Sequence, residues 1–210
     1  MYNLPYYKEK DAAVVLQFVK EHPFAMLCGC DENNKPVATQ IPVFIDERDG
    51  KLFLSGHMMK NTDHHKAFLQ NNRVLAVFSG AHCYISASWY ENKQMASTWN
   101  YQSVHAKGPL LFQEGQALID ILKRTTNYFE NNPHSGANFD DIPEEFVQRM
   151  TDAIVAFEIE VQDIDHVFKL SQDRDEKSYD NIVKELRKLE GDAKVIAEIM
   201  EKRKSKVFPS

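Results

Sequence analysis

The sequence contains little cysteine and no long hydrophobic stretch. Its 210 residues include three cysteines, an odd number, and none of them forms a Cys-x-x-Cys pair. No run approaches the roughly 20 apolar residues that a membrane-spanning helix needs. The N-terminal MYNLPYYKEKD carries charges where a secretory signal would be apolar. These absences predict free thiols, a cytoplasmic location and no membrane partner.

Signatures of metal binding and of nucleophilic catalysis are missing as well. Cys28 and Cys30 share one side of a predicted strand, and the adjacent His64 and His65 point in different directions on a predicted helix, so neither pair converges on a metal. No His-Glu-x-x-His motif occurs. Serines and histidines gather between residues 82 and 105, but no Gly-x-Ser-x-Gly elbow accompanies them. We therefore expect no metal site and disfavour a hydrolase.

The charge balance argues against a dedicated nucleic-acid binder. The formal net charge is −6, whereas binding to a phosphate backbone needs concentrated lysine and arginine. One dense basic run occurs, in the C-terminal tail, and comprises Lys202, Arg203, Lys204 and Lys206. Such a run is typical of a solvated helix end, where cations offset the helix dipole. Because no helix-turn-helix pattern stands out either, direct DNA binding is doubtful.

Short apolar runs separated by polar turns predict seven or eight strands. The runs span residues 24–30, 37–45, 51–55, 73–79, 83–90, 95–107, 154–161 and 167–170. Helices are predicted at 12–21, around 67–69, at 114–130, at 143–153 and, broken at Gly191, over the last forty or so residues. Short turns imply antiparallel pairing. We predict a β-rich α+β fold, an antiparallel split β-barrel with peripheral helices, as one domain over residues 1–210 with a helical extension from about 175–210.

Residues 82–105 hold both tryptophans and three of the eight tyrosines of the chain. Within 83–90 the residues alternate, so that Cys83, Ile85, Ala87 and Trp89 share one face of the predicted strand, and Tyr84, Ser86, Ser88 and Tyr90 share the other. A second strand would follow and end at Gly108-Pro109. Such a hairpin has one apolar face and one face of hydroxyls and aromatics, which suits a planar ligand or a dimer contact.

The segment GHMMKNT at 56–62 follows a predicted strand and precedes a predicted helix. Lys60, Asn61 and Thr62 would then lie at a helix N-terminus, where free N–H groups and the helix dipole attract anions. An ordinary helix start, capped by Asn61 or Thr62, explains the same residues. Combined with the aromatic face, however, the segment suits a ligand with a planar ring and a phosphate tail, such as flavin mononucleotide (FMN).

The motifs CYISASWY at 83–90 and STWNYQSVHAKG at 97–108 resemble the signature of the PaiB-type FMN-binding negative transcriptional regulators. HPFAML, QIP, GHMMKN and FKLSQDR occur in the order found in that family, so the resemblance covers nearly the whole chain. It implies a split-barrel flavoprotein that forms a homodimer with FMN between its subunits. The implied residues are His57, Lys60 and Asn61 for the phosphate end, Tyr84, Ser86, Trp99 and Asn100 for the ring, and Lys169 and Ser171, from the same or the partner subunit, to close the site.

Six positions depart from the family pattern, and three of them are Asn61-Thr62-Asp63, which replace an alanine-asparagine-proline run. Ala87 and Ser97 replace prolines, and Asp173 replaces the last residue of the family's KLSQN. Asp63 would stand near the phosphate and weaken FMN binding by like-charge repulsion. Three functions therefore remain open: a flavin-sensing regulator, an FMN-dependent oxidoreductase that uses a nicotinamide cofactor, and a dimer that has lost its flavin. A regulator is favoured over an enzyme.

Overall fold

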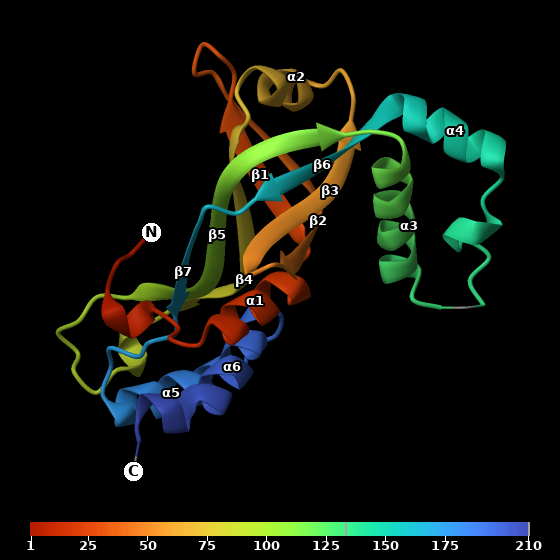
Figure 1. Ribbon diagram of the computed structural model, residues 1–210. Coiled ribbons are helices and arrows are strands. Elements are labelled where there is room, and N and C mark those ends of the chain that lie inside the picture. The colour runs from red at the N-terminus through yellow and green to blue at the C-terminus, as the bar shows by residue number, and fades with distance from the viewer. Residues whose placement is uncertain (133, 210) are drawn as a thin grey trace. The chain divides into compact units, whose positions relative to one another are not determined.

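The computed structural model describes residues 1–132 and 134–209. Within them, seven strands form one sheet in the order β4-β1-β2-β3-β6-β5-β7 (Figure 1). Strand β4 also pairs with β5, so the six strands from β4 to β5 form a closed ring. The pairs β1–β2, β1–β4, β2–β3, β3–β6 and β5–β6 are antiparallel. The strand bounds are β1 Phe24–Cys30, β2 Pro36–Arg48, β3 Lys51–Met59, β4 Arg73–Ile85, β5 Thr98–Gln113, β6 Ile154–Glu160 and β7 Asp163–Lys169. The predicted antiparallel, β-rich fold with peripheral helices is confirmed.

The helices begin and end close to where local signals place them. Asp11 caps α1, because its carboxylate accepts a hydrogen bond of 2.9 Å from the N–H of Ala13. Asn71 ends α2, and Gly191, with φ of 65°, precedes α6 at the predicted break. The α-helices are α1 Ala12–Glu21, α2 Asp63–Gln70, α3 Gln116–Glu130, α4 Glu144–Ala153, α5 Glu176–Leu186 and α6 Asp192–Val207.

The chain divides into two compact units. The terminal unit comprises residues 1–18, residues 79–104 and the chain from residue 165 onward. The central unit comprises residues 19–78 and 105–164. Each unit is described separately below, and the assignment of the whole chain to one domain stays a prediction.

In the central unit, α3 packs on β3 and β6, which lie side by side (Figure 1). The cluster beneath α3 is apolar and consists of Phe44, Leu118, Ile121, Leu122, Phe139 and Ala156. The other face of β3 carries Leu54, Gly56 and Met58, all buried. A Cβ atom at Gly56 would lie 2.7 Å from the carbonyl oxygen of Pro42, so this strand crossing requires glycine. The alternation of β3 thus separates an inner apolar face from a face directed toward α3.

In the terminal unit, α5 and α6 pack together, and the hydroxyl of the buried Tyr179 donates to the carbonyl of Met200 at 2.8 Å (Figure 1). The buried Glu9 forms ion pairs with Arg203 at 2.8 Å and with Lys206 at 2.6 Å. Burial alone would raise the pKa of Glu9, but hydrogen bonds from Lys206, the Asp11 N–H and Arg203 lower it to about 2. An ionised carboxylate therefore ties the N-terminal segment to α6.

The aromatic segment differs from the predicted hairpin. The runs predicted as two strands, 73–79 and 83–90, instead form one strand, β4, followed by a 3₁₀ turn at Ala87–Trp89. The turn forms because the Ser86 hydroxyl accepts from the Ser88 N–H, a local bond that competes with the sheet. Tyr90 then becomes completely buried, where the alternation predicted the polar face.

Three further boundaries differ from prediction. β3 continues through residues 56–59, which were predicted as a connecting segment. Separately, Leu69 on α2 was predicted as buried but is 62% exposed. β5 begins at Thr98 and passes through Gly108-Pro109 to Gln113. The strand can continue past this point because residue 108 is glycine. A Cβ here would collide with the backbone of β6, so only glycine permits the two strands to approach so closely.

Candidate functional site

The predicted phosphate residues lie at the end of β3 and in the turn before α2. Asn61 has a left-handed backbone, with φ of 65°, and its N–H donates to His65 Nδ1 at 3.3 Å. Thr62 is the N-cap, because its hydroxyl accepts from the His65 N–H. Asp63 Oδ1 accepts from the His64 N–H at 2.8 Å. Side chains of the turn therefore satisfy donors at the N-terminus of α2, so a phosphate here would depend chiefly on the Lys60 side chain.

The Lys60 ammonium lies 3.0 Å from the carboxylate of Glu114, two residues before the start of α3. The Lys60 side chain is 26% exposed and that of Glu114 is 71% exposed. An ion pair with so exposed a partner contributes about 0–1 kcal/mol, so a phosphate dianion can displace Glu114. Lys60 therefore offers a cation that an internal carboxylate holds only weakly.

His57 points to the α3 side of β3 and contains a buried polar atom, Nδ1, that has no hydrogen-bond partner. Burial lowers the pKa of this imidazole, so it is neutral at pH 7. A buried polar group without a partner costs about 1–3 kcal/mol, which a ligand that bonds to it would recover. The donor chemistry of His57 and Lys60 therefore fits a phosphate-bearing cofactor.

Asp63, the residue expected to oppose a phosphate, is engaged by its neighbour. Hydrogen bonds from the His64 N–H and side chain lower the pKa of the Asp63 carboxyl. Its Oδ1 lies 3.1 Å from His64 Nδ1. The carboxylate is thus charged and fully exposed to solvent, which screens its repulsion of an approaching anion.

The predicted ring-binding residues of the terminal unit include an exposed aromatic pair. Tyr84 on β4 is 51% exposed and Trp99 on β5 is 52% exposed. Their ring centroids lie 6.1 Å apart in an edge-to-face arrangement, and the His82 ring lies 6.1 Å from Trp99. Large aromatic side chains so open to solvent can stack on a planar ring or on a partner chain.

Asn100 lies on the other face of β5, because neighbouring residues on a strand point to opposite sides. It is completely buried, and its amide oxygen accepts a hydrogen bond of 3.1 Å from the hydroxyl of Ser171. Ser86 bonds within its own turn, to the N–H and hydroxyl of Ser88. The structure therefore places Tyr84 and Trp99 together but separates Asn100 from them.

Lys169 and Ser171 hold the FKLSQDR segment against β5. The Lys169 ammonium donates to the carbonyl of Trp99 at 2.9 Å and to the hydroxyl of Thr98. Burial lowers the pKa of Lys169, although Asp173 acts in the opposite direction. These contacts position the strand that carries Trp99.

Sequence reasoning missed two polar groups in the same unit. Tyr90 Oη and Arg174 Nε are buried without hydrogen-bond partners, and the guanidinium lies 4.9 Å from the centre of the Tyr90 ring. Both residues belong to motifs that carried the family resemblance, CYISASWY and FKLSQDR. The motifs could therefore have identified them, although the alternation of the strand assigned Tyr90 to the face of hydroxyls and aromatics.

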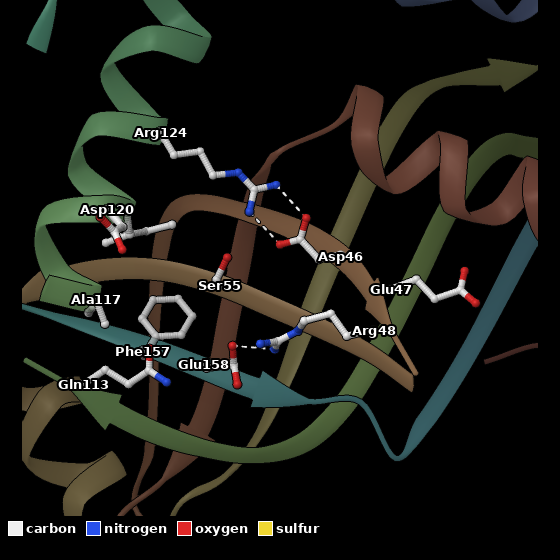
Figure 2. A pocket seen from close by; sticks show the side chains of 12 residues that line it. Asp46, Glu47, Arg48, Ser55, Gln113, Ala117, Asp120, Arg124, Phe157 and Glu158 are labelled. Atoms are coloured by element: carbon white, nitrogen blue, oxygen red, sulfur yellow. Dashed lines mark hydrogen bonds and ion pairs between the residues drawn. The ribbon is translucent and has the colours of Figure 1, made fainter. Parts of the chain in front are cut away.

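A cavity of about 500 Å³ in the central unit lies between α3 and strands β2, β3 and β6 (Figure 2). Arg124 binds Asp46 through two hydrogen bonds of 2.5 and 2.9 Å, and Arg48 pairs with Glu158 at 2.5 Å. The Ser55 hydroxyl points between these two ion pairs and is buried without a partner. None of the nine predicted site residues lines the cavity. The residues that line this cavity are far apart in the sequence, and no sequence motif indicates that they lie together.

The described residues, 1–132 and 134–209, contain neither a cluster of metal-binding side chains nor a helix suited to span a membrane. They contain no group of three or more His, Cys, Asp or Glu side chains able to hold a metal ion. No helix among them has the length and apolar character required to cross a membrane.

Comparisons with known proteins identify relatives over most of the chain. A family model described as "Putative FMN-binding domain" matches residues 1–163. The "Protease synthase and sporulation protein PAI 2" of Bacillus subtilis (strain 168) is 32% identical over 207 residues, which cover 98% of this chain and 99% of that protein.

Two solved structures are similar in fold, at 14% and 15% sequence identity. A "putative 5-nitroimidazole antibiotic resistance protein" from Bacteroides thetaiotaomicron has a TM-score of 0.55, covering 75% of this chain and 84% of that one. The flavocytochrome Anf3 from Azotobacter vinelandii has a TM-score of 0.54, covering 86% of this chain and 78% of that one. At such low identity these likenesses establish the fold.

Proposed function

The chain belongs to the PaiB-type family of FMN-binding split-barrel proteins, and from that premise we propose that it senses FMN and acts as a regulator in the cytoplasm. The observation that supports this most is the buried, unpartnered Nδ1 of His57, three residues before the weakly held cation of Lys60. We assign His57, Lys60 and Asn61 of the central unit to the phosphate, and the assignment of Tyr84 and Trp99 of the terminal unit to the ring stays a prediction. Lys169, Ser171 and Asn100 position the strand that carries Trp99.

When bound, FMN supplies a ring that accepts and releases electrons. The residues of this chain would bind and orient it. Lys60 would neutralise phosphate charge, and the neutral His57 would donate or accept one hydrogen bond.

FMN should raise the melting temperature of the purified protein. A ligand that binds only the folded state adds about 2.7 kcal/mol of stability at about a hundred times its dissociation constant. The measurement is a thermal melt with and without excess FMN, with adenosine monophosphate as a control that has a phosphate but no flavin ring. A melting temperature that does not change in excess FMN would favour a dimer that has lost its flavin. Steady NADH oxidation by the FMN-loaded protein would favour the oxidoreductase.

We also propose that the protein is a homodimer. Tyr84 and Trp99 are each about half exposed and their rings lie side by side, and large aromatic side chains are enriched at interfaces between chains. A specific dimer would bury roughly 1,600 Å² in total. Light scattering should therefore give twice the mass of one chain at micromolar concentration, and the mass of a single chain would contradict the proposal.

The protein should not bind DNA tightly or with sequence preference. In the basic tail, Arg203 and Lys206 share the carboxylate of Glu9, and Lys204 lies 2.7 Å from Asp180, so internal carboxylates offset part of the charge that a long DNA backbone would need. Any residual binding would be electrostatic and would fall steeply between about 50 and 200 mM salt. Fluorescence anisotropy titrations with promoter fragments and with scrambled duplexes measure the DNA affinity and its dependence on sequence and salt. Nanomolar, sequence-selective binding at physiological salt would show that the protein reads DNA directly.

A further inference from the structure

A second cavity, of about 260 Å³, lies in the terminal unit between the segment that precedes α1 and the last turns of α6. It is smaller than the roughly 300–1,000 Å³ typical of sites for drug-sized ligands. Four of the residues that line it are cationic and one is acidic, and Gln172 adds an amide. The charged residues are Lys8, Lys10, Arg203, Lys206 and Glu9.

The cavity is positive in a chain whose net charge is −6. Glu9 is shared by Arg203 and Lys206, so one negative charge faces two positive ones. Lys8 pairs with Asp165 at 2.5 Å, whereas the exposed Lys10 forms no ion pair with the residues that the structure describes. Even with Asp165 included, the cations exceed the carboxylates by two. Anions are attracted to such a concave, positively charged surface.

Neutralisation of the α6 dipole explains only part of this charge. Cations near the C-terminus of a helix are common because they offset its negative end, and this accounts for Lys206. It does not account for Lys8 and Lys10, which come from a segment almost two hundred residues away in sequence. Two separate parts of the chain therefore contribute cations to one small cavity.

The cavity also has unused hydrogen-bond donors. Arg203 Nε is buried without a hydrogen-bond partner, although another nitrogen of the same guanidinium lies 2.8 Å from Glu9. Lys8 uses two of the three ammonium N–H groups, one to Asp165 and one to the carbonyl of His166. A guanidinium and several ammonium groups together match the many acceptor oxygens of a phosphate.

We propose that this cavity binds a phosphate group, either as inorganic phosphate or as the phosphate of a small monoester. The site is distinct from the FMN phosphate site assigned to Lys60, which belongs to the central unit and lines no part of this cavity. Binding requires no covalent step.

The test titrates the full-length protein with sodium phosphate and with glycerol 3-phosphate by calorimetry, at constant ionic strength. The double variant Lys10→Gln/Lys206→Gln removes two lining charges, and Arg203 remains to pair with Glu9. Lys202→Gln is the matched control, because it removes an exposed charge from the same helix without lining the cavity. We expect at least about tenfold weaker binding in the double variant and less than about a twofold change in the control.

Titrations with FMN separate this proposal from the proposed function. The double variant should keep the FMN affinity of the wild type, and Lys60→Ala should keep the phosphate affinity. Whichever of the two phosphates binds more tightly identifies the source, and either result supports the site. The proposal is overturned if millimolar phosphate does not bind the wild type, if Lys202→Gln weakens binding as much as the double variant, or if the double variant also loses FMN.

Discussion

Replacing Lys60 with alanine should weaken FMN binding roughly ten- to a hundredfold and leave riboflavin binding nearly unchanged. A charged hydrogen bond typically contributes about 1.5–3 kcal/mol, and riboflavin has no phosphate to receive one. The Lys60 ammonium lies 3.0 Å from Glu114, so on binding FMN Lys60 would exchange this carboxylate for the phosphate dianion. Flavin fluorescence titration of both ligands against both proteins measures the difference.

A matched variant tests the same contact from the other side. Glu114→Gln removes the carboxylate that competes for Lys60, so FMN should bind up to about fivefold more tightly, in keeping with an exposed ion pair worth at most about 1 kcal/mol. Riboflavin should again respond little. If Lys60→Ala weakens both flavins equally, the phosphate binds elsewhere and Lys60 serves only the fold.

Features set by neighbouring residues were predictable from the sequence. The bounds of α1 and β1 agree with prediction, because a capping aspartate and an uninterrupted apolar run mark them locally. Thr62 was one of two predicted caps for α2 and is the N-cap in the structure. The motifs of the aromatic segment also indicated the family correctly, since a multipart match depends on order and spacing rather than on long-range contacts.

Features set by distant segments were not predictable. Alternation placed Tyr90 on the face of hydroxyls and aromatics, but a turn formed by serine side chains intervenes and the ring is buried. The grouping of Trp99 with Asn100 as ring-binding residues was a different kind of error, because local strand geometry already places adjacent residues on opposite faces. The two cavities combine residues far apart in sequence, and no local pattern reports which distant charges will face each other.

Gly108→Ala should destabilise the protein by about 3 kcal/mol, near the upper end of the cost of overpacking. A Cβ at this position would lie 2.0 Å from the carbonyl oxygen of Glu160 and 3.0 Å from the Ile159 side chain. The first contact is with a backbone atom, which cannot relieve the clash by changing rotamer as a flexible side chain can. Strands β5 and β6 would have to separate where Leu110 pairs with Ile159.

For a chain of this size, such a loss corresponds to a melting temperature lowered by roughly 6–12 °C. Gly136→Ala is the control, because its Cβ would meet nothing within 4 Å and its φ is not positive. An exposed substitution of this kind should change stability by less than about 0.5 kcal/mol. Urea denaturation of both variants measures the difference. Equal midpoints for the two would mean that β5 does not cross β6 closely at Gly108, and the strand would then end there as its Gly-Pro sequence predicts.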